Sequence, residues 1–275
     1  MKEPIVDAAT QELLRRYAAQ YETSDFLAGD PSYWMHQVSG VENQETMAFL
    51  ASCLSYGSRK QFMPKIGQLL EWADGEVYSW VREGAFNEHF RAGDTDCFYR
   101  LYNNDCMHNF LCASQQLLLD YGSLGAYVSS AASDGYGAVQ AICSFYASKG
   151  VSVVVPKDTQ SACKRVCMYL RWMVRSGSPV DLGLWAGFID RRTLIMPLDT
   201  HVVSQSVRLG LLPCRAASMS AARRLTAALA TVFPDDPLRG DFALFGYGVS
   251  NDAYLIANCF KFSALRCWNG YNLAF

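Results

Sequence analysis

The sequence of 275 residues lacks the patterns that hold metal ions or disulfide frameworks. Its ten cysteines include no CxxC pair, and its four histidines form neither an HxxxH nor an HExxH pattern. Zinc sites and iron–sulfur clusters depend on such closely spaced ligands. We therefore expect no metal, no cofactor and reduced thiols, as in a cytosolic protein.

Long apolar runs, low-complexity tracts and internal repeats are absent as well. The aliphatic segment at 151–155 is far too short to span a bilayer. The first residues, MKEPIVDAATQELLRR, carry charge throughout and contain no apolar core, so we expect no signal peptide. Hydrophobic residues make up 51% and charged residues 18%, which indicates a globular chain. These features predict a cytoplasmic protein that does not contact a membrane.

Positive charge is scarce overall but concentrated in one part of the chain. The net charge is −2, which argues against a protein that coats nucleic acid non-specifically. Between 151 and 234, however, eleven Lys and Arg face four acids, a net +7 that leaves −9 for the remainder. Such a basic segment inside an acidic protein indicates an anionic ligand. The alternative is a helical surface whose arginines are solvated and paired.

Helical periodicity dominates the sequence, and no series of alternating strands is evident. In the first half the predicted helical segments are 12–21, 43–54, 61–73, 98–101, 107–121 and 136–148. In the second half a helix starts near Thr159 or Ser161 and ends at Ser176. The segment 182–188, LGLWAGF, is predicted to form a short helix or turn.

Three further helices are predicted towards the C-terminus. One runs from an Asp199 N-cap to Leu209, with Gly210 as its stop, and another begins at Ser218 or Ser220 and reaches 232. Asp241 is predicted to cap the last one. Together these patterns predict an all-α chain of about ten helices. The absence of a linker favours one compact unit over 1–275, or two lobes made from interleaved segments.

A stripe of cations marks the helix that follows Ser161. Lys164, Arg171 and Arg175 are spaced i, i+7 and i+11, which places them on one narrow face, with Arg165 beside it. Nearby guanidinium groups and partial burial disfavour the charged form of a lysine and lower its pKa. Lys164 is therefore a candidate nucleophilic amine. The alternative is a solvated cationic face without a ligand.

Asp199 stands in the sequence PLDTH at a predicted helix N-terminus. The helix dipole and the free backbone N–H groups keep an aspartate at this position ionised. The simpler interpretation is an N-cap that contributes only stability. Pattern alone leaves both open.

The two features together resemble a known family of DNA-repair enzymes. The string MPLDTHVVSQSVRLGLL resembles the Asp-Thr-His-Val stretch of the endonuclease III family, and SACKRVCMYLRWMVR resembles the lysine-bearing helix of the bifunctional glycosylases. The separation of 35 residues between Lys164 and Asp199, and the segment AFLASCLSYGSRKQ, are similar to the archaeal 8-oxoguanine glycosylases. The nearest overall resemblance, over 30–251, is to an uncharacterised bacterial family related to these helix-hairpin-helix DNA glycosylases.

This resemblance implies a glycosylase-like fold of two interleaved lobes around a cleft, with the lysine and aspartate in a core at 156–234. It implies a base-excision repair glycosylase with AP-lyase activity, in which Lys164 forms a Schiff base and Asp199 assists. The substrate would be duplex DNA with a damaged base, an oxidised purine being the leading candidate. Candidate phosphate contacts are Lys157, Arg165, Arg171, Arg175 and Arg208, and we expect a monomer.

The sequence departs from the family in two places. No glycine lies between Pro156 and Lys164, where the family has a Gly-rich hairpin that holds a DNA phosphate, so Lys157 and the following helix start would have to replace it. The C-terminal iron–sulfur cysteines are also missing, so no cluster is expected. The alternative function is a catalytically inactive helical module that binds nucleic acid or protein. Nothing in the sequence distinguishes DNA from RNA.

Other conspicuous side chains are predicted to be structural. Trp172, Trp185, Phe242 and Phe245 have the spacing of core residues rather than of a base-stacking surface. His201 follows Asp199 directly and is predicted to support the start of the helix.

Overall fold

The computed structural model describes residues 6–250 and is mostly helical. Its ten α-helices are α1 (Ala8–Tyr21), α2 (Val41–Leu54), α3 (Arg59–Trp72), α4 (Val77–Arg82), α5 (Asn104–Tyr121), α6 (Leu124–Ala131), α7 (Gly135–Ser148), α8 (Lys164–Val174), α9 (Thr200–Arg208) and α10 (Met219–Ala230). A further helical segment occupies 239–250. The expectation of a predominantly helical chain is thus confirmed.

Short elements complete the described part of the chain. Four 3-10 helices lie in the connections, η1 (Ser24–Leu27), η2 (Pro31–His36), η3 (Ala85–Glu88) and η4 (Arg191–Thr193). Strands β1 (Cys97–Tyr99) and β2 (Tyr102–Asn103) form an antiparallel hairpin, the one sheet within 6–250. No helix in this range is both long and apolar enough to cross a membrane.

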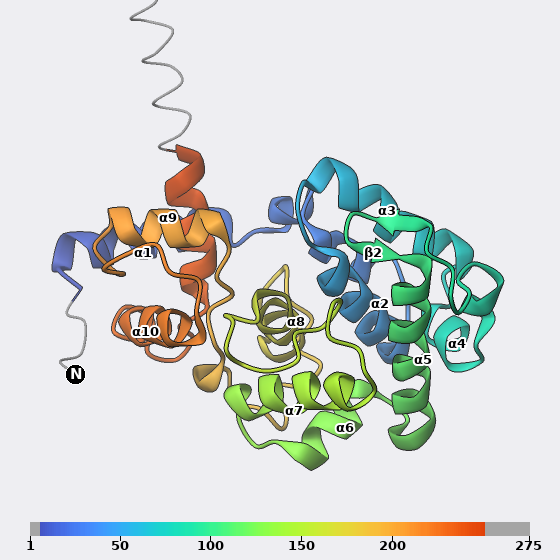
Figure 1. Ribbon diagram of the computed structural model, residues 1–275. Coiled ribbons are helices and arrows are strands. Elements are labelled where there is room, and N and C mark those ends of the chain that lie inside the picture. The colour runs from blue at the N-terminus through green and yellow to red at the C-terminus, as the bar shows by residue number, and fades with distance from the viewer. Residues whose placement is uncertain (1–5, 251–275) are drawn as a thin grey trace, which may run out of the picture.

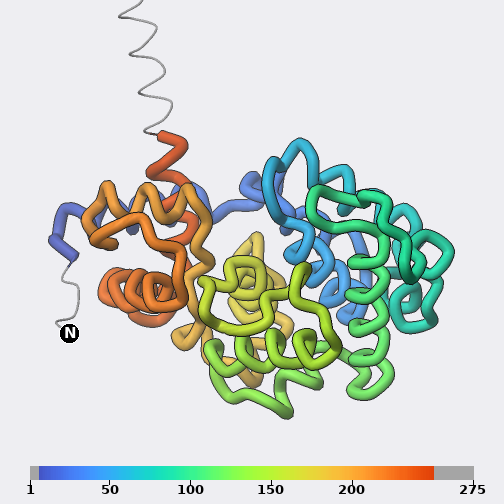
Figure 2. The backbone as a smooth tube through the Cα atoms, in the orientation of Figure 1, coloured from blue at the N-terminus to red at the C-terminus, as the bar shows by residue number. Residues whose placement is uncertain are grey.

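The helices fall into two groups with α8 between them. Figure 1 shows α1, α9, α10 and the segment 239–250 together on one side, α2 to α5 on the other, and α6 and α7 beneath α8. The tube in Figure 2 shows that the first group is built from both ends of the described chain. Tyr17 packs edge-on against Tyr247 with ring centroids 6.1 Å apart, and Tyr21 packs against Phe245 at 5.9 Å. The N-terminal helix therefore belongs with the C-terminal ones.

The position of α8 follows from its composition. Every residue from Val166 to Val174 is buried, including Arg171, and the helix packs against α2 and α7. The buried carboxylate of Glu45 on α2 braces the surroundings of α8, because it accepts hydrogen bonds from Leu124 N (2.9 Å) and Trp185 Nε1 (2.8 Å). Hydrogen-bonded pairing of this kind offsets the cost of burying a charge.

The predicted caps of the two helices that follow α8 are correct, whereas the start of α1 was predicted too late. Asp199 caps α9 and Ser218 caps α10 as predicted, and Gly210 has φ 71° just beyond α9. Asp7 accepts a hydrogen bond from Thr10 N (2.9 Å), so α1 begins four residues before the predicted start. The segment 182–188 forms a turn, one of the two predicted forms.

Other expectations were wrong. The segment 98–101, predicted to be helical, belongs to the β1–β2 hairpin, where Tyr99 and Tyr102 pair across a two-residue turn. The short helices α4 and α6 were missed. Asp241 does not cap the last helical segment, which begins at 239, because it lies within that segment; its carboxylate pairs with Arg171.

Candidate active site

A cavity of about 820 Å³ opens where the two groups of helices meet. Its lining comes from six parts of the chain that are distant in sequence: the η1–η2 region, the α2–α3 connection with the start of α3, the start of α8 with the segment before it, the start of α9 with the segment before it, the connection between α9 and α10, and the segment 239–250. Both Lys164 and Asp199 are among the lining residues. The two residues singled out from the sequence therefore share one cavity.

Lys164 is the first residue of α8, and its side chain is partly buried. Burial lowers the pKa of Lys164, while the negative charges of Asp199, Asp30 and Asp241 oppose this shift. The positive charge of Arg165 acts in the same direction as burial. The side chain of Lys164 forms no ion pair or hydrogen bond with another residue of the range 6–250. The amine is thus available to a ligand in the cavity.

The start of α8 differs from the expected one. Neither Thr159 nor Ser161 caps the helix; the N-cap is Cys163, which has φ 46° and provides no side-chain hydrogen bond. The preceding segment 149–163 is irregular rather than a compact hairpin, and Val154 and Val155 anchor it in the core. Because helix α8 starts later than predicted, Lys164 lies in its first turn and lines the cavity from there.

Asp199 is fixed by the backbone of α9. Its Oδ1 accepts a hydrogen bond from Val202 N at 2.7 Å, which confirms its predicted role as N-cap. Its other oxygen, Oδ2, accepts no hydrogen bond from a described residue, and the residue is exposed. The cap therefore orients the carboxylate while one oxygen stays available to the cavity.

Two more carboxylates line the cavity and were not identified from the sequence. Asp30 Oδ1 accepts hydrogen bonds from Ser32 N (3.0 Å) and Ser32 Oγ (2.7 Å), and Asp30 Oδ2 lies 3.6 Å from Arg59 Nη2. Asp241 pairs with Arg171. Burial raises the pKa of Asp241, with Arg171 acting in the opposite direction. No local pattern marks these two residues, because the cavity joins segments far apart in the chain.

Aromatic side chains form the apolar walls of the same cavity, at Phe26, Tyr56, Phe62 and Phe245. Phe26 and Phe245 pack edge-to-face with centroids 5.0 Å apart. The prediction of core packing is confirmed for Trp172, Trp185 and Phe242, which are buried. Phe245 is only partly buried and contributes to the cavity wall as well.

The cationic stripe on α8 faces the interior, which corrects the expectation that Arg171 and Arg175 contact phosphates. Arg171 is 3% exposed and Arg175 1% exposed. Arg171 pairs with Asp181 (3.2 Å) and Asp241. Arg175 donates to Asp236 (2.8 Å), and also pairs with Asp181 and Glu22. Because α8 is central, Arg171 and Arg175 pair with carboxylates of other segments, whereas Lys164 at the start of the helix lines the cavity.

These ion pairs keep both arginines charged. Burial disfavours the charged guanidinium of Arg175, but the surrounding carboxylates outweigh it and raise its pKa. A buried ion pair of this kind depends on every member having its partner, since an unpaired buried charge is strongly destabilising. Arg171 lines the cavity floor through this network, and it connects the cavity to the core.

The other predicted phosphate contacts lie in different environments. Arg165 lines the cavity and donates to Cys53 O (2.9 Å) and to Tyr102 Oη. Lys157 is exposed on the segment before α8. Arg208 is exposed on α9, where it donates to Gln205 Oε1 (3.3 Å). Neither Lys157 nor Arg208 is among the residues that line the cavity.

Arg59 and Arg215 are cavity-lining cations that the sequence did not single out. Both are exposed, and Arg215 donates to Ser204 Oγ at 3.3 Å. The guanidinium of Arg59 pairs with Asp30. The signal that could have identified Arg59 is its position two residues after the turn at Gly57, within the segment AFLASCLSYGSRKQ.

His201 also lines the cavity, and its environment is mostly structural. The residue is partly buried, its ring lies 6.4 Å from that of Phe245, and Nε2 is buried without a hydrogen-bond partner among the described residues. The ring packs so closely on the backbone of Gly248 that a Cβ on this glycine would overlap Nε2. These contacts agree with a packing role for His201.

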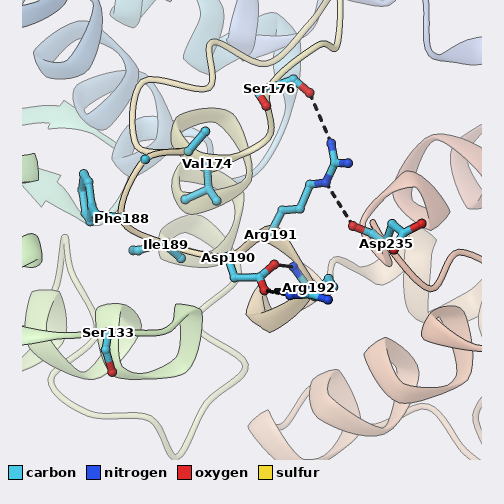
Figure 3. Close-up of a pocket in the computed structure, with 11 residues that line it drawn as sticks. Ser133, Val174, Ser176, Phe188, Ile189, Asp190, Arg191, Arg192 and Asp235 are labelled. Carbon is cyan, nitrogen blue, oxygen red and sulfur yellow. Dashed lines mark hydrogen bonds and ion pairs between the residues drawn. The ribbon is translucent and has the colours of Figure 1, made fainter.

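A second hollow, of about 660 Å³, lies at the opposite end of α8, beside Val174 (Figure 3). Arg191 donates to Asp235 O (3.0 Å) and to Ser176 O (3.5 Å), while Arg192 pairs with Asp190 (2.5 Å). In this hollow Arg192 is thus paired with a carboxylate, and Arg191 is held by two backbone carbonyl groups. The range 6–250 also contains no cluster of acidic, Cys or His side chains placed to hold a metal, and its eight cysteines are free thiols.

Comparison with known proteins identifies a family for this chain. A family model described as "Protein of unknown function (DUF2400)" matches residues 30–250. Neither the curated proteins nor the solved structures include a match. The matched range contains Lys164, Asp199 and the other cavity-lining residues except Phe26.

Proposed function

The chain belongs to the DUF2400 family, and from its cavity we propose that it is a DNA glycosylase with AP-lyase activity. The observation that carries the proposal is the presence of Lys164 and Asp199 in one cavity, with the lysine pKa lowered by burial. The resemblance of the segments around these residues to the helix-hairpin-helix glycosylases supports it. The proposed substrate is duplex DNA with a damaged base, an oxidised purine being the leading candidate.

The size and lining of the cavity support binding of an extruded nucleotide. Its volume of about 820 Å³ is within the range of small-molecule sites, roughly 300–1,000 Å³. A base must leave the helical stack before an enzyme can reach its C1′ atom, and aromatic side chains commonly stack on the extruded base. Phe26, Tyr56 and Phe245 provide such surfaces in the same cavity as the lysine.

Lys164 acts in the proposed reaction as the nucleophile. Its neutral amine attacks C1′ of the deoxyribose while the bond from C1′ to the base breaks, and the base leaves with the bonding electrons. Loss of the amine proton and opening of the sugar ring at O4′ give an imine. Removal of a C2′ proton then expels the 3′ phosphate, and water releases the lysine. Burial supports this role because it increases the neutral fraction of the amine.

Asp199 acts as the ionised partner of the lysine. Its free oxygen accepts the proton of the attacking amine or stabilises the positive charge that develops on the sugar. The hydrogen bond from Val202 N fixes the orientation of the carboxylate. Lys157, Arg165 and Arg208 remain candidate phosphate contacts, and the exposed cations Arg59 and Arg215 join them because they line the cavity.

Borohydride trapping tests the proposal directly. The protein is mixed with duplexes that contain 8-oxoguanine or an abasic site, and borohydride reduces any imine to a stable covalent adduct. We expect an adduct with the wild type, none with Lys164→Gln, and an unchanged yield with Lys149→Gln as the control at an exposed lysine outside the cavity. An adduct that survives in Lys164→Gln would refute the assignment of the nucleophile.

The absence of an adduct with every substrate would favour the alternative function, an inactive helical module that binds nucleic acid or protein. The observation that favours this alternative is the irregular segment 149–163, which stands where the helix-hairpin-helix glycosylases have a Gly-rich hairpin. Binding to undamaged duplex in that experiment, without covalent capture, would support it.

A further inference from the structure

The β1–β2 hairpin is unusual in a chain that is otherwise helical over the described residues. Its turn consists of two residues, Arg100 and Leu101, between the paired Tyr99 and Tyr102. Arg100 has φ 52°, in the left-handed region that glycine adopts most easily. A large side chain at such a position is uncommon and is a reason to ask what the turn does.

The two turn residues have opposite surroundings. The guanidinium of Arg100 lies over the ring of Tyr56, 5.1 Å from its centroid. Leu101 is 68% exposed, more than any other exposed large hydrophobic residue of the described chain. Arg100 is thus anchored on the body of the protein, and Leu101 projects into solvent.

The side of the hairpin that carries the Arg100 guanidinium packs against the rim of the cavity. Tyr56 and Gly57 line the cavity, and Tyr99 Oη donates to Tyr56 O. Gly57 leaves room for the anchor, because a Cβ on this residue would lie 2.5 Å from Arg100 Nη1. The other side of the hairpin packs on α3, where the ring centroids of Phe98 and Trp72 are 6.1 Å apart. Figure 1 shows the hairpin beside α3 and α5. The hairpin tip is therefore held firmly next to the cavity mouth.

A nucleotide that moves from a duplex into the cavity leaves a gap in the base stack. Proteins that distort DNA commonly fill such gaps with an apolar side chain, which compensates for the lost stacking. A leucine that is exposed, carried on a braced turn and placed at the cavity rim meets this requirement.

We propose that Leu101 enters the base stack of duplex DNA beside the nucleotide held in the cavity, while Arg100 braces the turn against Tyr56. This inference rests on the proposed function, since it assigns the duplex contact of the same site. Leu101 is a positioning residue in this role, because it stabilises the extruded nucleotide and does not touch the reacting atoms.

A fluorescent duplex tests the insertion without knowledge of the lesion. The duplex carries a tetrahydrofuran abasic analogue with 2-aminopurine as the neighbouring base, whose fluorescence rises when stacking is lost. We expect a rise on binding of the wild type and a rise at least about threefold smaller with Leu101→Ala. Leu101→Met keeps an apolar side chain and should restore the signal. Leu119→Ala, at a leucine 53% exposed on α5 and away from the cavity, is the matched control.

The outcomes separate this inference from the proposed function. An equal rise with Leu101→Ala, or binding of the wild type without any rise, would overturn the role of Leu101 even if Lys164 forms its adduct. If the fluorescence rise depends on Leu101 but borohydride traps no adduct of Lys164, the duplex contact would be supported and the proposed glycosylase activity would be contradicted. On a pre-formed abasic site, where no base must be extruded, trapping by Leu101→Ala should stay within about threefold of the wild type. Failure of the wild type to bind the duplex would overturn both.

Discussion

Lys164 and Asp199 are held in the cavity by the starts of two different helices, α8 and α9. A residue in the first turn of a helix has a well-defined backbone position, and here each side chain reaches the same space. The surroundings of Lys164 contain three carboxylates that favour its charged form, yet burial prevails and lowers its pKa. At the scale of single residues, this balance controls the fraction of neutral amine.

The pH dependence of adduct formation should report this balance. Because the pKa of Lys164 is lowered by burial, the neutral amine becomes the main form at a lower pH than for an exposed lysine. The rate of borohydride trapping on abasic duplex should rise with pH and level off once the pH passes this lowered pKa. A rate that keeps rising up to pH about 10.4, the ordinary pKa of lysine, would contradict it.

Stability provides a check that does not depend on activity. A lysine whose pKa is lowered in the folded state destabilises the fold fully at low pH. This penalty is relieved as the pH rises from the folded to the unfolded pKa. The gain in unfolding free energy caused by Lys164→Gln should therefore shrink as the pH rises. Lys157→Gln, at an exposed site, should show no such trend.

Two substitutions of Asp199 separate its structural and chemical roles. Asparagine is as good an N-cap as aspartate, so Asp199→Asn should keep the hydrogen bond to Val202 N and change stability by less than about 0.5 kcal/mol. Asp199→Ala should cost about 1 kcal/mol, measured by urea unfolding. Both should lower the trapping rate by roughly 100-fold, because both remove the charge. Full activity of Asp199→Asn would show that Asp199 serves only as the N-cap of α9.

At the scale of elements, α8 is a central helix whose polar side chains must be satisfied by other segments. Its arginines meet carboxylates from the turn after α8, the segment 239–250 and the N-terminal region. If the charge of an arginine or of its carboxylate partner is removed, the other group of the ion pair stays in the interior without a partner. The helix is therefore stabilised by long-range ion pairs as well as by apolar packing.

The network gives a prediction for stability. Arg175→Met removes the shared partner of Asp181 and Asp236 in the interior and should lower the free energy of unfolding by roughly 3–5 kcal/mol. The control is Arg192→Met, because the side chains of the Arg192–Asp190 ion pair are 62% and 40% exposed and its loss should have little effect on stability. Equal effects in urea unfolding would mean that the buried pairs contribute no more than a surface pair.

At the scale of the whole molecule, the cavity lies between two groups of helices, one of which contains both ends of the described chain. The segment with the concentrated positive charge is not uniformly exposed, because Arg171 and Arg175 are used internally. The cations left for a duplex are distributed around the cavity and on α9.

Duplex binding should therefore depend on salt through a limited set of cations. The affinity should fall as salt rises, and Arg215→Ala and Lys157→Ala should each reduce the slope of log K against log salt by about one. Arg192→Ala, at the far end of α8, should leave the slope unchanged. A slope near zero for the wild type would contradict phosphate binding at this face.

The sequence by itself determined the helical nature of the chain and the caps of α9 and α10, and it singled out Lys164 and Asp199 as candidates. Caps such as Asp199 and Ser218 depend on residues three positions away, so local pattern is enough to find them. The direction of the α8 stripe and the approach of Asp30 and Asp241 required the tertiary structure. The Arg171–Asp241 pair spans 70 positions and the Arg175–Glu22 pair 153, and burial is decided by such distant contacts. Local periodicity defines a face of a helix, but only packing decides what that face meets.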